Sequence, residues 1–209
     1  MAAGEESVNL DTFMASGKHV KQLFSRYGNT SDICVAEGVM GLFDGYDGMK
    51  GSSAEIAGLI GIPVVLVLNA KSTAYSVAPV LYGFKHFYPG IRIVGVVFNF
   101  VASEAHYAYL QQACGDAGVE ALGYLPKDDR IVIPSRHLGL SIDESFCFDA
   151  FADRVAGVVD KTVNVDRLLE LCTVDFPVYE EKMTDVSEKT RIAIARDEAF
   201  NFMYRENIE

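Results

Sequence analysis

Short apolar runs alternate with longer amphipathic stretches through the middle of the chain. The run 63–68 is apolar at every position, which is typical of a parallel strand covered on both faces. The stretch 103–117 spaces its apolar residues as a helix does, and Ser103 is a suitable N-cap. The pattern predicts strands at 32–37, 63–68, 91–98, 120–124 and 191–195, and helices at 11–27, 54–60, 73–87, 103–117, 146–160 and 165–171.

The alternation of strands and helices predicts an α/β fold. Strands joined through helices form right-handed crossover units, so the sheet is expected to be mostly parallel and flanked by helices. The first helix is expected to face inward through Leu23 and Phe24. The second helix is expected to begin with a capping box made by Ser52 and Glu55.

The last part of the chain has a different character. Residues 173–190 are charged and lack periodicity, which indicates a linker. The apolar run 191–195 then predicts the first strand of another domain, of which residues 191–209 are only the beginning. The predicted organisation is therefore one domain over 1–172, a linker over 173–190 and a domain start over 191–209.

The charge and the cysteine content argue against several kinds of partner and site. The net charge is −11, so we expect no nucleic-acid partner and no anionic membrane partner. None of the four cysteines lies in a Cys-x-x-Cys pair, and Cys34 is expected to be a buried thiol. The chain shows no secretory leader and no run long enough to span a bilayer, so a cytoplasmic location is expected.

The first candidate site is the segment that runs from Glu37 to Gly45. If 32–37 is a central parallel strand, Glu37 lies at the carboxyl end where open α/β sheets bind ligands. Asp44 follows seven positions later, across a loop that contains glycine, so both carboxylates are expected to reach one Mg²⁺. A solvated turn with two acidic residues explains the same pattern, and both interpretations stay open at this stage.

The segment from Gly45 to Ser52 resembles a phosphate-binding loop only in composition. It contains glycines, Lys50 and a serine, but their spacing differs from Gly-x-x-x-x-Gly-Lys-Ser/Thr. That spacing does not occur anywhere in the 209 residues.

Two further groups of residues are candidates for ligand binding. Asn99 ends the run 91–98, and a strand-end amide can both donate to and accept from a purine edge. Pro126 follows the last predicted strand of the sheet and is expected at the rim of the same pocket, although both residues also suit ordinary turns. Arg136 and His137 concentrate basic groups in an acidic chain, and an arginine fork suits a carboxylate.

Together these motifs resemble one enzyme family. The strings Glu-Gly-Val-Met-Gly-Leu-Phe-Asp-Gly (37–45) and Gly-Ser-Ser-Ala-Glu-Ile-Ala (51–57) resemble the amidoligase domain of cobyrinic acid a,c-diamide synthases. Arg-His-Leu-Gly-Leu (136–140) and the run 195–204 also resemble that family, as does Asn-Leu-Asp (9–11). The resemblance covers nearly the whole chain, and the runs around Glu37 and after Ala195 are its most specific parts.

The resemblance implies a fold and a reaction. The family has an ATP-dependent domain similar to P-loop NTPases and dethiobiotin synthetase, followed by a glutamine amidotransferase domain. ATP activates acetate side chains of a corrin, cobyrinic acid, and ammonia from glutamine converts them to amides. On this resemblance Glu37 and Asp44 are catalytic and bind Mg²⁺. Asn99 and Pro126 bind the nucleotide, and Arg136 and His137 lie near the substrate.

The departures from the family pattern matter equally. The phosphate loop is expected before Asn9, so the fold is incomplete at its N-terminus and the chain alone is expected to be inactive. Ser135 stands where an acid is common in the family, and Asn69 where Asp is common. The alternatives are a synthase acting on hydrogenobyrinate or nickel sirohydrochlorin, or a non-catalytic P-loop-like binding module. A homodimer is also left open.

Overall fold

The computed structural model describes residues 7–133, 135–136, 139–140, 146–175, 179, 191–197, 203–204 and 208. The chain divides into two compact units. One unit consists of residues 61–174, and the other consists of residues 3–60 together with 175–209. Each unit is described on its own.

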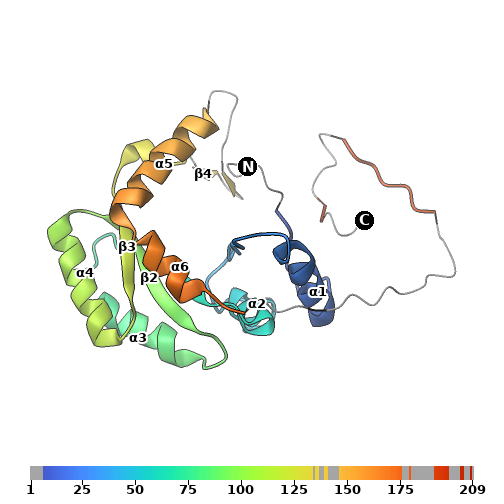
Figure 1. The fold of residues 1–209 in the computed structure, drawn as a ribbon, viewed down its shortest axis with the longest axis horizontal. Coiled ribbons are helices and arrows are strands. Elements are labelled where there is room, and N and C mark those ends of the chain that lie inside the picture. The colour runs from blue at the N-terminus through green and yellow to red at the C-terminus, as the bar shows by residue number, and fades with distance from the viewer. Residues whose placement is uncertain are drawn as a thin grey trace. The chain divides into compact units, whose positions relative to one another are not determined.

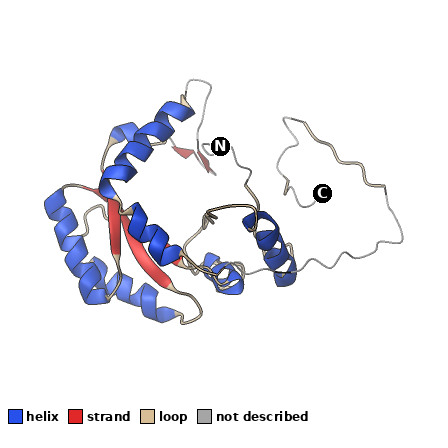
Figure 2. Cartoon of the chain, in the orientation of Figure 1, coloured by secondary structure: helices blue, strands red, loops and turns tan. Residues whose placement is uncertain are grey.

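A three-stranded parallel sheet forms the centre of the unit 61–174. Its order is β1-β2-β3, with β1 at Val64–Asn69, β2 at Ile93–Val101 and β3 at Ala121–Pro126. Helices α3 (Val77–Phe87) and α4 (Glu104–Ala117) lie on one face, and α5 (Phe148–Thr162) and α6 (Val165–Cys172) lie on the other (Figures 1 and 2). This arrangement confirms the predicted α/β class with a parallel sheet flanked by helices.

Shorter elements complete this unit. A 3₁₀ turn, η1, covers Asp129–Ile131, and a small antiparallel pair joins β4 (Ser135–Arg136) to β5 (Gly139–Leu140). Among the described helices, none combines the length and hydropathy that a membrane-spanning segment needs.

The core of this unit is built around β2, which has a strand on each side. Val96 and Phe98 of β2 are fully buried, as are Leu110 of α4 and Leu122 of β3. At Gly95 a Cβ atom would meet the side chain of Leu122 at 2.6 Å, so the small residue lets β2 and β3 lie close together. The prediction that the all-apolar run 63–68 is covered on both faces is wrong for β1. Leu66 is buried, but the next residue, Val67, points to the opposite face of the sheet and is 66% exposed.

Helix ends follow the local sequence. Ser103 caps α4, since its hydroxyl accepts a hydrogen bond from the N–H of His106 at 3.2 Å, which confirms the predicted N-cap. The predicted helix 73–87 begins only at Val77, because a turn precedes it in which Ser72 has a φ of 60°. Pro79 then lies in the first helical turn, where its missing N–H costs nothing.

The second unit contains α1 (Gly17–Gly28) and α2 (Ser53–Ile60), which contact each other. Val20, Leu23 and Phe24 of α1 are buried, so the predicted inward face is confirmed. This helix begins six residues later than predicted. The Asp11 carboxylate accepts hydrogen bonds from the N–H groups of Phe13 and Met14, which closes a separate turn, and Ser16 then caps the helix.

Two predicted strands are wrong. Residues 32–37 carry no regular secondary structure and are exposed, with Val35 at 90% exposure, and residues 191–195 are likewise irregular and exposed. A strand needs a hydrogen-bonded neighbour, and no described strand pairs with either segment. Glu37 therefore does not end a central strand in this structure. Cys34, predicted as a buried thiol, is also exposed because it belongs to this segment.

Most of the predicted linker lies outside the described residues, so the predicted domain boundaries stay a prediction. In the described part of residues 191–209, residues 191–197 are exposed, whereas the Tyr204 hydroxyl donates a hydrogen bond to Asp11 at 2.8 Å.

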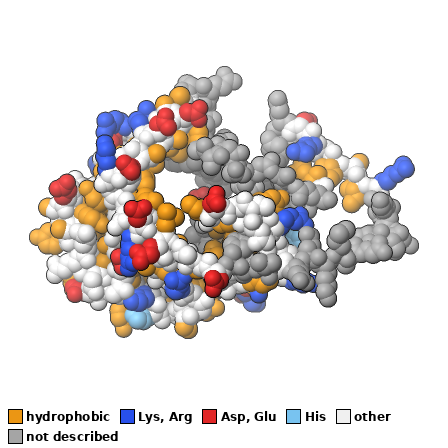
Figure 3. Space-filling model, viewed as in Figure 1, with side chains coloured by type: hydrophobic (Ala, Val, Ile, Leu, Met, Phe, Trp, Pro, Cys, Tyr) orange, Lys and Arg blue, Asp and Glu red, His pale blue; other side chains and the backbone are white. Residues whose placement is uncertain are grey.

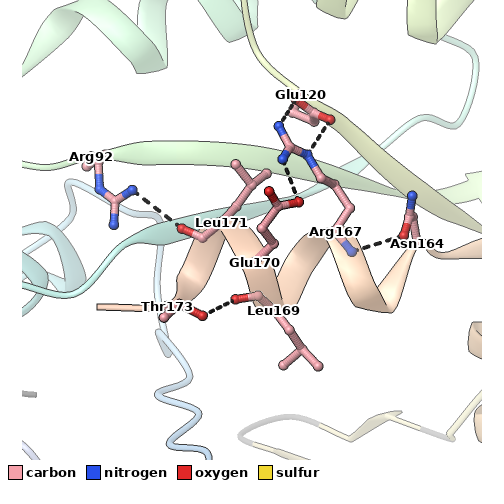
Figure 4. A network of polar contacts seen from close by, with 8 residues as sticks. All are labelled: Arg92, Glu120, Asn164, Arg167, Leu169, Glu170, Leu171 and Thr173. Carbon is pink, nitrogen blue, oxygen red and sulfur yellow. Dashed lines mark hydrogen bonds and ion pairs between the residues drawn. The ribbon is translucent and has the colours of Figure 1, made fainter. Parts of the chain in front are cut away.

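A polar network ties α6 to the sheet (Figure 4). The Arg167 guanidinium bonds both oxygens of Glu120, just before β3, at 3.0 and 3.3 Å. Its Nη1 also reaches Glu170 of the same helix at 2.7 Å. The Asn164 side chain caps the helix by accepting from the N–H of Arg167. The bond from Arg167 holds the pKa of Glu120 below its ordinary value, although partial burial opposes it.

This ion pair predicts a pH-dependent contribution to stability. Because the folded pKa of Glu120 is lowered, its stabilisation is fully present above the unfolded glutamate pKa of about 4.3 and is lost as pH falls through the folded pKa. Urea unfolding of the wild type and Glu120→Gln should therefore differ at pH 7 and converge near pH 3. Glu170→Gln is the control, since it leaves the link to β3 intact. A difference that persists unchanged at pH 3 would contradict the assignment.

Candidate functional site

The loop that carries Glu37 and Asp44 packs onto the start of α2. The N–H of Asp44 donates to the carbonyl of Gly41 at 2.9 Å, which closes a turn. The N–H of Ala54 donates to the carbonyl of Leu42 at 2.9 Å, which fixes the loop against the first turn of α2. The loop is therefore ordered by backbone bonds although Glu37 and Asp44 are both exposed.

Glycines allow this close packing. A Cβ atom on Gly41 would collide with the Asp44 carboxylate, and one on Gly38 would collide with the Ser53 hydroxyl. A Cβ on Gly45 would strike the carbonyl group of Lys50, with its carbon at 2.7 Å. The glycine-containing pattern in the sequence is thus explained by close approaches of backbone and short polar side chains.

The start of α2 departs from a full capping box. The buried Ser52 hydroxyl accepts from the N–H of Glu55 at 3.2 Å, as predicted. The Glu55 carboxylate instead accepts from the N–H of Gly51 at 2.6 Å and from the hydroxyl of Thr12 at 2.9 Å. The sequence pattern gives no sign of the bond between Glu55 and Thr12, because the two positions are 43 residues apart.

The segment that imitates a phosphate loop is a tight turn. Asp47 and Lys50 form an isolated antiparallel bridge, and the Lys50 ammonium pairs with the Asp47 carboxylate at 2.7 Å. The N–H groups of Gly45 and Tyr46 bond back to the carbonyls of Gly48 and Lys50 at 2.9 Å. Because these donors are used within the turn, they are not directed at an anion. The geometry therefore agrees with the interpretation that this segment resembles a phosphate-binding loop only in composition.

The loop can supply hard oxygen ligands. Glu37 and Asp44 are carboxylates on an exposed, glycine-supported segment, and Mg²⁺ commonly takes one or two carboxylates together with phosphate oxygens and water. Within the described ranges no group of three or more His, Cys, Asp or Glu side chains is arranged to hold a metal ion. Two carboxylates match the number that Mg²⁺ commonly takes from a protein.

The second set of candidates lies at the carboxyl edge of the sheet. Asn69 of β1 pairs with Asn99 of β2, and Val101 of β2 pairs with Pro126 of β3. Asn69 and Asn99 therefore lie side by side near this edge. Strand β2 continues two residues past Asn99 to Val101, so Asn99 does not end the strand as predicted, and a pocket shared by Asn99 and Pro126 stays a prediction. The carboxyl edge of a parallel sheet is where α/β folds place ligands.

The backbone after Asn99 is unusual. Phe100 has a φ of 60°, a conformation that bulky residues rarely adopt. The Asn99 side-chain oxygen accepts from the N–H of Phe100 at 2.8 Å, and the Asn69 side-chain oxygen accepts from the N–H of Lys71 at 2.9 Å. Both amides are therefore oriented by their own strand ends, which leaves their NH₂ groups as donors.

The third set is only partly described. Arg136 belongs to β4, where it pairs with Gly139 of β5. Its side chain and all of His137 lie outside the described residues, so the structure does not place their functional groups. The first set belongs to the unit of residues 3–60, while the second and third belong to residues 61–174.

Curated relatives match nearly the whole chain. The chain is 42% identical to the cobyrinate a,c-diamide synthase of Caldanaerobacter subterraneus subsp. tengcongensis, over 97% of this chain and 46% of that protein. It is 36% identical to the synthase of Saccharolobus solfataricus, over 100% of this chain and 48% of that protein. It is 37% identical to the synthase of Priestia megaterium, over 97% of this chain and 45% of that protein. The chain spans about half the length of the curated relatives it matches. No family model and no solved structure matches.

Proposed function

Because this chain belongs to the cobyrinate a,c-diamide synthase family, we propose that it forms the larger part of an ATP-dependent amidoligase domain in such an enzyme. The observation that carries the proposal is the identity of 42% over 97% of the chain to a protein of that name. The proposed reaction converts the a and c acetate groups of cobyrinic acid to amides, in cobalamin biosynthesis. Glutamine is the proposed source of ammonia.

The proposed chemistry has two steps. A substrate carboxylate oxygen attacks the γ-phosphorus of ATP, and ADP leaves. Ammonia then attacks the activated acyl carbon, phosphate leaves, and the nitrogen loses a proton to become the amide. The first step needs charge stabilisation on the transferred phosphoryl group, which is the largest catalytic term in such reactions.

Each candidate residue has a proposed role in these steps. Glu37 and Asp44 would hold Mg²⁺, which would supply charge neutralisation for the transferred phosphoryl group when bound. Asn99 and Pro126 contact the nucleotide base, and the orientation of the Asn99 amide supports this, since its NH₂ group is available as a donor. Arg136 and His137 contact the corrin carboxylates. These roles rest on the resemblance and on the chemistry of the side chains.

A chimera tests the proposal. The matching half of the Caldanaerobacter synthase is replaced by this chain, and the product is incubated with ATP, Mg²⁺, glutamine and cobyrinic acid. We expect amide products, resolved by chromatography and mass spectrometry, and the same products with free ammonia in place of glutamine. The 209 residues by themselves are expected to form no amide, since they contain no phosphate loop to donate backbone N–H groups.

Parallel incubations distinguish the substrate. Hydrogenobyrinic acid and nickel sirohydrochlorin are offered to the same chimera, and cobyrinic acid should give the highest kcat/KM. A folded chimera that amidates none of the three, while the unaltered Caldanaerobacter enzyme does, would refute the proposal.

A further inference from the structure

A hollow of about 400 Å³ lies between the 3₁₀ turn η1 and the first half of α5. Its lining combines two arginines with three apolar side chains and one acid: Arg130, Arg154, Phe146, Phe151, Val132 and Asp129. The unit that contains it shows acidic and basic side chains mixed with apolar atoms across its surface (Figure 3). In a chain with a net charge of −11, two guanidinium groups beside an aromatic pair are a distinctive local environment.

The first arginine is held in a fixed orientation. Its Nε lies 2.9 Å from Oδ1 of Asp128 and its Nη2 lies 2.6 Å from Oδ2 of the same residue. Asp128 is 17% exposed, whereas Arg130 is 80% exposed. This pairing lowers the pKa of Asp128 to about 2, so the carboxylate stays ionised at neutral pH. The Nη1 group of Arg130 takes no part in this pairing and is left for a ligand.

The second arginine is available in full. Within the described part of the chain, no side chain or backbone group forms a hydrogen bond to Arg154, although its charge adds to the lowering of the Asp128 pKa. Arg154 lies three positions after Phe151, so the two side chains share one face of α5. A planar guanidinium with all its donors available matches the two oxygens of a carboxylate.

Phe146 and Phe151 form an aromatic surface in the hollow, which indicates that part of the ligand is apolar. The rings of Phe146 and Phe151 lie 5.3 Å apart between centroids at an angle of 49°. Val132 on the opposite element is 49% exposed, so its apolar surface is also available. Such a surface favours a flat or apolar body, because contact with it removes apolar area from water. A small hydrophilic anion would gain nothing from it.

We propose that this hollow binds a peripheral carboxylate of the corrin substrate, with Arg154 and the Nη1 group of Arg130 holding the carboxylate and the phenylalanines contacting the ring. The proposal rests on the proposed function and adds a substrate-binding site that the family motifs did not identify. Asp129 sets a limit on the site. Its carboxylate repels a second acidic group, so one carboxylate enters between the arginines.

Binding of cobyrinic acid to the 209-residue chain tests the site, with the corrin absorbance as the signal. Arg154→Gln should weaken binding roughly 10- to 100-fold, which is the loss of a charge-assisted hydrogen-bonded pair. Asp129→Asn should tighten binding, because it removes a repulsive charge. Lys161→Gln is the matched control: it removes one positive charge from the last turn of the same helix and should leave binding unchanged.

Two further ligands define the specificity. Citrate carries carboxylates without a ring and should bind far more weakly than cobyrinic acid, in every variant. ATP carries a phosphate chain and should bind equally to the wild type and to Arg154→Gln. Loss of ATP binding in that variant, or equal cobyrinic acid binding in wild type and variant, overturns the proposal.

The chimera separates this inference from the proposed function. If the chimera forms amides, and Arg154→Gln in it raises the KM for cobyrinic acid with little change in kcat, both the proposed function and the substrate site are supported. If it forms amides and the variant leaves KM unchanged, the hollow is not the substrate site although the function holds. If no amide forms but the isolated chain binds cobyrinic acid through Arg154, the site stands and the proposed function falls.

Discussion

Replacing Glu37 by Gln in the active chimera is expected to lower kcat by roughly 100-fold or more, because a lost metal ligand removes several kcal/mol of charge stabilisation from phosphoryl transfer. The substitution keeps the size of the side chain and removes its charge. Glu37 is exposed, so the fold should be unaffected. The rate of ammonia-dependent amide formation at saturating ATP is the measurement.

The control is Asp47→Asn, which makes the same change of charge ten residues further along the same loop. Asp47 pairs with Lys50 at the surface, and both side chains are more than half exposed. Its loss should leave kcat within a factor of about two, as expected for an exposed ion pair. Full activity of the Glu37→Gln chimera would remove Glu37 from the proposed metal site. A similar loss in both variants would point to a general effect of charge.

Gly123→Ala is expected to destabilise the unit 61–174 by about 3 kcal/mol. Gly123 lies in β3 with a φ of 148°, a conformation that residues with a Cβ rarely adopt. A Cβ there would collide with the carbonyl of Thr162 and lie 2.5 Å from the Cα of Val163. The end of α5 would have to move away from the sheet, which would also strain the bond from the N–H of Asn164 to Leu122. The midpoint of urea unfolding is the measurement.

Gly115→Ala is the matched substitution, and we expect it to change the stability in the opposite direction. Gly115 lies inside α4, and a Cβ at this position meets nothing within 4 Å. Alanine should therefore stabilise the protein by about 0.5–1 kcal/mol through helix propensity. Equal effects of the two substitutions would show that the close approach of β3 to the end of α5 is absent in solution.

The sequence predicted the unit 61–174 well because its signals are local. The apolar residues of the run 63–68 are enough to predict a strand there, and Ser103 caps α4 through a neighbour three positions away. Asn99 and Pro126 could be placed at one edge because parallel strands in adjacent positions end together. Those predictions used no information about distant parts of the chain.

The errors arose where a partner decides the structure. Residues 32–37 have the composition of a strand, yet strand formation depends on a neighbour that the described residues do not supply. The link from Glu55 to Thr12 and the hollow beside Arg154 each join segments far apart in sequence. The periodicity of a single sequence does not encode such contacts. Glu37 and Asp44 could therefore be named as candidates, but the irregular backbone around Glu37 could not be predicted.

The exposed edge of β1 affects how any solution experiment on this chain behaves. Among the described strands, β1 lies at one edge of the sheet, and it is apolar from Val64 to Leu68. On its outer side no described strand accepts its backbone groups. Such an edge is a template on which further strands can assemble, so the chain in concentrated solution is expected to lose protein to aggregates. A titration that stays the same on dilution reports the folded monomer, whereas one that changes reports growth at this edge.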